Sequence, residues 1–282
     1  MKELTVINIL LGVWLALGAA VFVALFFIAA PYGRHVRKGW GHTVGNKLGW
    51  VLMEAPAPIT FAVCFFLGGS WGITGILFLA LWEAHYLHRA FIYPFSLRGT
   101  RRIPLSVVSF GFFFNVMNAY LNGRYIYTFS GGYGVSWLTD PRFIIGAVLF
   151  ITGFVINRRA DNVLRDLRRP GESGYKISYD RLFRWVSSPN YLGEMTIWIG
   201  WAIATWSWPG ATFAFWTVAN LLPRYGSTPS DGMAAGKGIL PHWEMMRHNY
   251  YKNMGWDENS GVPLPETLKE LGLDYVIPQL VK

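Results

Sequence analysis

Two polar side chains stand out because they lie within long apolar runs. Glu54 has no Lys or Arg within one helical turn, and Tyr86 follows His85 in a later run. An ionisable group at membrane depth is costly and is therefore a candidate functional residue. A buried Glu that is hydrogen-bonded to a Tyr hydroxyl can act as a proton-donating pair. We therefore predict Glu54 and Tyr86 as catalytic residues, with Glu54 either finding a partner across the bundle or staying protonated.

Amide side chains recur in another apolar run. Asn115, Asn118 and Asn122 occur there, and the last two lie one helical turn apart on one face. These amides could bind a ligand, or they could join neighbouring helices by hydrogen bonds. Glu83 and Arg89, in the run that contains Tyr86, could in turn simply lie at the membrane interface. Both alternatives stay open on the sequence.

A basic segment, residues 157–176, carries a second candidate site. Arg165, Arg168 and Arg169 fall on one helical side before a Pro-Gly pair ends the helix. Guanidinium groups suit phosphates, but a row of Arg also anchors a helix on anionic lipid. Asp161 favours a nucleotide, because a carboxylate can accept hydrogen bonds from ribose hydroxyls while a lipid anchor does not need one.

Several familiar signatures are absent from the sequence. It contains no G-x-G-x-x-G, G-x-x-x-x-G-K-[ST] or G-x-S-x-G motif. His85 and His88 are three residues apart, but no third ligand is evident, so we predict no metal site. Cys64 is the single cysteine, which excludes a disulfide framework. A nucleotide would therefore be held by the ends of membrane helices and by loops.

The elements that position these residues follow from composition. Only 15% of the 282 residues are charged and 52% are hydrophobic, whereas a soluble domain has roughly 25% charged residues. Several uncharged stretches exceed the length of about 20 residues that crosses a bilayer. We therefore predict an all-α integral membrane protein with seven transmembrane helices, at about residues 5–30, 50–67, 71–93, 104–123, 142–158, 190–206 and 209–223.

The basic residues alternate between the two sides of this bundle. The loops at 31–49, 94–103 and 159–189 are rich in Lys and Arg, whereas the opposite connections carry almost none. The positive-inside rule then puts the basic side in the cytoplasm, with the N-terminus outside and the C-terminus cytoplasmic. The formal charge of +9 is thereby explained by topology, and we predict no nucleic-acid partner.

The composition changes after Arg224. The net positive charge lies within residues 1–223, and the remainder of the chain is close to neutral. We therefore predict two parts: a membrane domain at 1–224 and a soluble tail at 225–282. Helix-like pieces are expected within the tail near His242–Met254 and Pro265–Leu271.

Several motifs resemble the steroid 5-alpha-reductase family. They are HYLHRAFIY at His85–Tyr93, DNVLRDLRRPGE at Asp161–Glu172, and LFRWVSSPNYLGE at Leu182–Glu194, which continues through Trp198–Ser207. The resemblance covers about residues 1–224, and its last two blocks are long and specific. Enoyl-CoA and polyprenol reductases belong to the wider family, so the chemistry is better defined than the substrate.

The resemblance implies a seven-helix membrane fold that holds NADPH at its cytoplasmic side. It implies hydride delivery to C5 of a 3-oxo-Δ4 steroid, with Tyr86 and Glu54 in the positions of the pair that stabilises the enolate at the C3 carbonyl. The positions that match the family's cofactor-lining residues are Asn118, Asn157, Asp161, Arg165, Arg168, Tyr175, Asn190 and Glu194, with Arg101 and Arg224 as weaker candidates.

The sequence departs from the family pattern in two places. Steroid-reducing members usually have Gln before the catalytic Glu, and here that substrate-binding position is Met53. After Arg224 the family runs directly into a helix containing His and Tyr, whereas here about 20 residues intervene. His248 and Tyr251 could be that pair, displaced, and are added to the cofactor-binding candidates. The tail also resembles the C-terminus of aldehyde ferredoxin oxidoreductases, so it could be a fused segment.

The sequence thus predicts an NADPH-dependent 3-oxo-5-alpha-steroid 4-dehydrogenase. The alternatives are a reductase of another enone or enoyl lipid, an isoprenylcysteine-type membrane methyltransferase, and a non-enzymatic lipid or sterol binder. The expected partners are a steroid or other hydrophobic enone and membrane lipid, with the chain acting as a monomer. The expected location is the bacterial inner membrane or the endoplasmic reticulum, with the cofactor site facing the cytoplasm.

Overall fold

A computed structural model describes residues 2–27, 41–97, 102–167, 181–184, 186, 188–223 and 243–280. The chain divides into two compact units, Met1–Ser227 and Thr228–Lys282, and each is described by itself.

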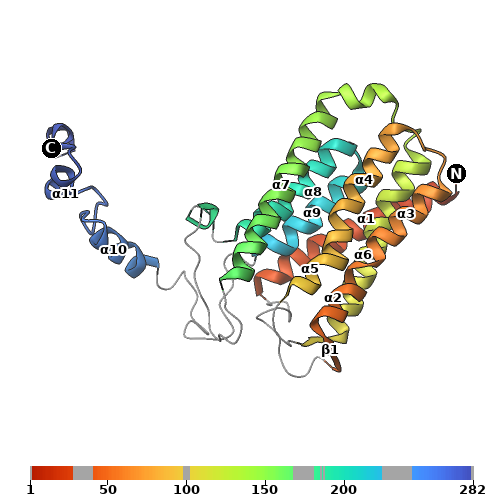
Figure 1. Cartoon of the computed structure of the whole chain (residues 1–282), viewed down its shortest axis with the longest axis horizontal. Helices are drawn as coiled ribbons and strands as arrows, with labels where there is room; N and C mark the ends of the chain where they lie inside the picture. Colours follow the sequence, from red (N-terminus) through yellow and green to blue (C-terminus); the bar gives the residue numbers. More distant parts are fainter. Residues whose placement is uncertain are drawn as a thin grey trace. The chain divides into compact units, whose positions relative to one another are not determined.

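Long helices that run alongside one another make up the first unit (Figure 1). Over the described residues, each of the seven predicted spans is largely helical. The helices are α1 (Lys2–Phe27), α2 (Asn46–Glu54), α3 (Pro56–Leu67), α4 (Ile73–Leu87), α5 (Tyr93–Ser96), α6 (Leu105–Arg124), α7 (Pro141–Asp166), α8 (Pro189–Thr205) and α9 (Trp208–Leu221).

Local signals in the sequence account for the helix boundaries. The Asp140 side chain accepts a hydrogen bond from the Arg142 amide at 2.9 Å, which caps α7 ahead of Pro141 at its first position. Ser207 caps α9 in the same way through the Gly210 amide at 3.1 Å. The predicted break between the sixth and seventh spans is therefore confirmed at the residues expected.

Prolines shape the segment that carries Glu54. The chain stays helical from α2 into α3, but Pro56 and Pro58 have no amide N–H. In a regular helix those amides would bond the carbonyls of Leu52 and Glu54. The backbone hydrogen-bond ladder is therefore interrupted beside the Glu54 side chain.

The end of α4 continues as a π-helical turn, His88–Ile92, that leads into α5. The Tyr93 amide bonds the carbonyl of His88, five residues back, and Pro94 cannot donate to Ala90 in the α-helical manner. Such π turns are frequent at functional sites. This one carries Arg89 into the bundle.

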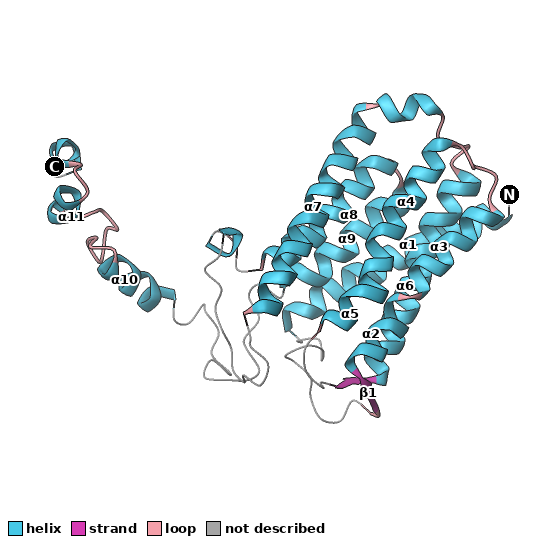
Figure 2. Ribbon diagram, viewed as in Figure 1, coloured by secondary structure: helices cyan, strands magenta, loops and turns pink. Residues whose placement is uncertain are grey.

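Two short strands were not predicted. Strand β1 (Thr43–Gly45) pairs antiparallel with β2 (Arg102–Pro104), and Figure 2 shows the pair in magenta. The Arg102 side chain donates to the carbonyl of Thr43 at 2.6 Å. The expectation of an all-α chain is corrected here, because a pairing between segments this far apart in sequence leaves little local signal.

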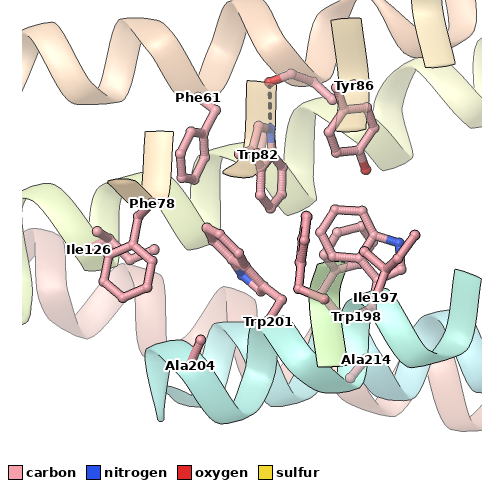
Figure 3. Packing of buried hydrophobic residues seen from close by; sticks show 14 of the residues in the cluster. Phe61, Phe78, Trp82, Tyr86, Ile126, Ile197, Trp198, Trp201, Ala204 and Ala214 are labelled. Atoms are coloured by element: carbon pink, nitrogen blue, oxygen red, sulfur yellow. Dashed lines mark hydrogen bonds between the residues drawn. The ribbon is translucent and has the colours of Figure 1, made fainter. Parts of the chain in front are cut away.

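Aromatic side chains form the core of the first unit (Figure 3). The rings of Phe61 and Trp82 stack with centroids 4.3 Å apart. Trp198 and Trp201, one turn apart on α8, meet Trp82 edge-on or tilted at 5.3 and 5.2 Å. Because aromatic pairs prefer such offset and edge-to-face contacts, this core fixes α3, α4 and α8 relative to one another.

Helices α7 and α8 approach closely through glycines. A Cβ at Gly193 would lie 2.5 Å from the Asn157 nitrogen, and a Cβ at Gly146 would lie 2.3 Å from the Ala204 nitrogen. Small residues allow backbones in a membrane bundle to touch in this way. The contact at Gly193 places the first turns of α8 directly against the later part of α7.

Apolar surface covers the outside of the bundle. Phe110 and Phe113 on α6 are 70% and 67% exposed. Within the described ranges, three helical stretches are long and apolar enough to cross a membrane: Glu3–Phe27, Asn46–Leu67 and Pro141–Asp166. These features are those of a membrane protein. Seven crossings and their orientation remain predictions.

The second unit is small and helical over its described part. Helix α10 (Trp243–Asn253) and helix α11 (Pro265–Glu270) match the two helices expected in the tail, and η8 (Asp274–Val276) and α12 (Ile277–Leu280) follow. Thr267 donates to the carbonyl of Gly255 at 2.6 Å, which joins the turn after α10 to α11.

Candidate active site

Glu54 lies at the last residue of α2 and is only 9% exposed. Its Oε2 accepts a hydrogen bond from Asn115 Nδ2 at 3.2 Å, and its Oε1 lies 3.7 Å from Arg89 Nε. The partners come from α6 and from the π turn after α4. The expectation that Glu54 finds a partner across the bundle is therefore confirmed.

Arg89 is held between aromatic rings. Its guanidinium carbon lies 5.0 Å from the centroid of the Trp50 ring and 5.3 Å from that of Tyr93. Cation–π contacts of this kind hold a guanidinium at low solvent access. The Arg89 charge also interacts with Glu194 and Asp161, so it lies between the Glu54 end of the site and the α7–α8 end.

Tyr86 is 3% exposed and projects from α4 into the aromatic core (Figure 3). Its ring centroid lies 5.6 Å from that of Trp198 and 5.0 Å from that of His85. The Glu54 carboxylate interacts electrostatically with Tyr86. Within the described residues, however, the structure contains no hydrogen bond between these two side chains. The hydrogen-bonded form of the pair stays a prediction.

Glu194 on α8 gathers donors from three helices. Its Oε1 lies 3.3 Å from His85 Nε2 on α4 and accepts from Trp198 Nε1 at 3.0 Å. Its Oε2 accepts from Asn157 Nδ2 on α7 at 3.1 Å. Because buried carboxylates are stable only when they are well bonded, this set of donors explains how Glu194 is accommodated.

The predicted cofactor residues of α7 and α8 lie together. Asn157 Nδ2 also donates to the Asn190 carbonyl at 2.9 Å, and the Asn190 side chain interacts with the Asp161 carboxyl group. These residues line the junction between the later part of α7 and the first turns of α8. Helix N-termini favour anions, so the start of α8 suits a nucleotide phosphate.

An unpaired donor lies in the same stretch of α7. Among the residues that the structure describes, buried Arg158 Nη1 has no hydrogen-bond partner, while its guanidinium carbon lies 5.9 Å from the ring centroid of Phe154. A buried charged donor without an acceptor is costly. A phosphate oxygen of a dinucleotide would supply that acceptor, so the donor set at this junction fits NADPH.

Other predicted cofactor residues have partners elsewhere. Asn118 Oδ1 accepts from Trp14 Nε1 of α1 at 3.1 Å, and Asn118 Nδ2 donates to the Phe114 carbonyl. Asn118 therefore joins helices, as the alternative interpretation of these amides held. Arg165 forms a two-point ion pair with the neighbouring Asp166, at 3.0 and 3.1 Å.

The remaining candidates cannot be placed in this cluster. Arg101, Arg168, Tyr175 and Arg224 lie outside the described residues. His248 and Tyr251 belong to α10 of the second unit. There His248 pairs with Glu258, and the Tyr251 ring packs against Gly261 and Trp256.

Three residues of the site were not assigned a catalytic or cofactor-binding role from the sequence. Asn115, His85 and Arg89 contact Glu54 or Glu194 directly. Each had been noted as a polar residue in an apolar run. The sequence held no signal for which helix face they occupy relative to the two glutamates.

Comparisons with known families agree with these motifs. The profile of the family described as 3-oxo-5-alpha-steroid 4-dehydrogenase matches residues 101–228. A second profile, described as aldehyde ferredoxin oxidoreductase, domains 2 and 3, matches residues 215–273. The second match agrees with the resemblance noted for the tail.

Similar proteins come from plants and mammals. The chain is 40% identical over 215 residues to the steroid 5-alpha-reductase DET2 of Gossypium hirsutum, covering 73% of this chain and 82% of the relative. It is 38% identical over 212 residues to the 3-oxo-5-alpha-steroid 4-dehydrogenase 1 of Homo sapiens, covering 74% and 82%. The corresponding protein of Bos taurus is 36% identical over 216 residues, covering 74% and 83%. With identity and coverage at this level, the chain belongs to the steroid 5-alpha-reductase family.

Proposed function

We propose that the chain reduces the Δ4 double bond of a 3-oxo-Δ4 steroid, with NADPH as the reductant. The proposal is carried by one observation: Glu54 and Tyr86 are buried next to Arg89, whose charge also acts on Glu194 and Asp161 at the α7–α8 junction. Catalytic and cofactor residues then share one polar region. The names of the relatives support the same oxidoreductase activity.

The protein's own groups would act at the steroid carbonyl. When bound, NADPH would supply the hydride that C5 of the enone takes up. As negative charge builds on the C3 oxygen, the Tyr86 hydroxyl donates a hydrogen bond to it, and Glu54 orients that hydroxyl. The neighbouring carbon takes its proton from solvent. The aromatic core around Tyr86 excludes other water from the reacting atoms.

The cofactor would be held at the α7–α8 junction. Asn157, Asp161, Asn190 and Glu194 support this through their mutual contacts. The proposed set also includes Asn118, Arg165, Arg168, Tyr175, Arg101 and Arg224, and, from the second unit, His248 and Tyr251. A chain that ends at Arg224 tests the last two, because unchanged affinity for NADPH would remove them from the set.

We further propose a multi-pass arrangement in which this junction faces the cytoplasm. The Lys- and Arg-rich loops on that side support it. A reporter fused after residue 223 tests this orientation, since an external location of the reporter would contradict it.

The central experiment uses the purified full chain in detergent or nanodiscs with NADPH and testosterone or progesterone. We expect steroid-dependent loss of NADPH absorbance, and Glu54→Gln and Tyr86→Phe to slow turnover by about 100-fold or more. No NADPH consumption with any steroid or enoyl thioester would refute the reductase. Near-normal rates in both variants would remove their catalytic roles. Stabilisation by S-adenosylmethionine and not by NADPH would indicate the methyltransferase instead.

A reductase of a different enone or enoyl lipid is the second candidate, and Met53 is the observation that favours it. Its side chain packs on Gly111 of α6, where a Cβ would lie 2.0 Å from Met53 Cγ. An apolar side chain therefore occupies the substrate-side position next to Glu54. Relative kcat/KM values for steroids and enoyl thioesters distinguish the two substrates.

A further inference from the structure

The Glu54 carboxylate is held by a side-chain amide from another helix. Asn115 on α6 is 5% exposed, and its Nδ2 donates to Glu54 Oε2 at 3.2 Å and to the Met53 carbonyl at 2.8 Å. Both acceptors are oxygens that cannot donate in their usual forms, so the amide is oriented with its nitrogen toward α2. Its two protons are thereby used on two consecutive residues.

The packing of α2 against α6 makes this contact available. Gly111 lies one turn before Asn115 on α6, and a Cβ there would lie 2.4 Å from Met53 Sδ. The absence of that Cβ lets the Met53 side chain lie across the α6 backbone. The end of α2 then comes close enough for the short Asn115 side chain to reach both oxygens.

The two oxygens of Glu54 thus have separate partners. Asn115 bonds Oε2, while Arg89 approaches Oε1 from the π turn after α4. A carboxylate with a hydrogen bond at one oxygen and an ion pair at the other is restricted in its rotation about its terminal bond. The interrupted ladder at Pro56 and Pro58 makes this external support more important, because the local backbone contributes less to holding the residue.

We propose that Asn115 is a positioning residue, whose amide on α6 sets the orientation of the Glu54 carboxylate for work at the substrate carbonyl. The inference rests on the proposed function, since it gives Asn115 a role only through Glu54. It also accounts for the apolar Met53 beside Glu54 on α2, because the amide next to the carboxylate is supplied by Asn115 on α6.

The test compares two variants in the full chain. Asn115→Leu keeps the approximate shape of the side chain and removes the donor. We expect its kcat for the 3-oxo-Δ4 steroid to fall about tenfold or more, the scale for a lost hydrogen bond to a charged group, while its Kd for NADPH stays within about twofold. Met53→Gln in the Asn115→Leu background returns an amide to the same space between α2 and α6, because Gln and Met have similar length. We expect the kcat of this double variant to be at least about threefold higher than that of Asn115→Leu alone.

A matched control uses a buried amide with a structural role. Asn122 lies on the same helix and bonds Trp201 Nε1 at 2.9 Å and the Asn118 carbonyl at 3.0 Å. Asn122→Leu is expected to lower the melting temperature without lowering kcat selectively. Where Asn115→Leu does not accumulate in the membrane, Asn115→Ser serves, because its hydroxyl is too short to reach both oxygens.

The outcomes separate the inference from the proposed function. A wild-type chain that reduces no enone overturns the proposed function itself. A wild-type chain that is active, with Asn115→Leu within about twofold of its kcat, overturns the role of Asn115 alone. A second result also overturns the role of Asn115. In it, kcat and the melting temperature fall equally in Asn115→Leu and Asn122→Leu, and adding Met53→Gln to Asn115→Leu does not raise kcat.

Discussion

His85 Nε2 lies 3.3 Å from Glu194 Oε1, and this contact joins α4 to α8. His85 directly precedes Tyr86 in the sequence. Asn157 and Trp198 bond the same carboxylate. Glu194 therefore couples the helix that carries the proposed proton donor to the two helices that carry the proposed cofactor residues. A substitution at Glu194 should therefore weaken NADPH binding more than steroid binding.

We expect Glu194→Gln to weaken NADPH binding by about tenfold, because the new amide nitrogen would face the donors of Asn157, Trp198 or His85. Quenching of tryptophan fluorescence during titration with NADPH measures this Kd. Glu83→Gln is the matched control, since Glu83 is a half-buried carboxylate on α4 whose Oε1 has no hydrogen-bond partner in the described part of the chain. Its Kd should match that of the wild type. Equal effects of the two substitutions would contradict the role of Glu194.

The close approach of α7 and α8 leads to a second prediction. A Cβ at Gly193 would lie 2.5 Å from the Asn157 nitrogen, so Gly193→Ala must push the two helices apart. We expect a lower melting temperature together with weaker NADPH binding, because the same contact holds Asn157 against Glu194. Gly12→Ala on α1 is the control, since nothing lies within 4 Å of the Cβ it would add. Unchanged NADPH affinity in Gly193→Ala would show that the close packing of α7 and α8 is not needed for cofactor binding.

Much of the helical architecture could be predicted because its signals are local. The turn residues at Ser207–Gly210 act within a few positions, and the apolar runs are long. The π turn at His88–Ile92 was missed, although Pro94 was a clue to it. The strand pair at Thr43–Gly45 and Arg102–Pro104 was missed because it depends on segments distant in the chain meeting.

The site was predicted unevenly for a related reason. Glu54 could be chosen from its cost in an apolar run, and a partner across the bundle followed from that cost. Its actual partners, Asn115 and Arg89, depend on how α6 and the π turn are rotated about their axes. The rotation of α6 also decides the partner of Asn118, which faces Trp14 of α1, and this too could not be predicted from the sequence.

The cap of α7 predicts a response to acid. Hydrogen bonds from the Arg142 side chain and amide lower the pKa of Asp140 from 3.8 to about 2. A carboxyl whose pKa is lower in the folded state stabilises the fold above its unfolded pKa, and this contribution is lost as the pH falls from 3.8 toward about 2.

Asp140→Asn isolates this effect, because Asn still caps a helix but carries no charge. The difference in melting temperature between wild type and variant should be larger at about pH 5 than at about pH 3. Thermal unfolding of both proteins in the same detergent at the two pH values measures it. A difference that does not change with pH would show that the Asp140 charge contributes nothing to the cap.

Arg158 leads to the last prediction. Within the described residues its buried Nη1 has no hydrogen-bond partner, and its charge acts on Asp161 of the proposed cofactor set, so a phosphate of the dinucleotide is the acceptor that would satisfy it. We expect Arg158→Gln to weaken NADPH binding by about tenfold, the scale of a charge-assisted hydrogen bond, and the loss to shrink as salt rises. Arg159→Gln removes the same charge from an exposed neighbour and should change the Kd little. If both variants bind NADPH as tightly as the wild type, the unpaired nitrogen is not a phosphate contact. If both lose affinity equally, only the net charge of this segment matters.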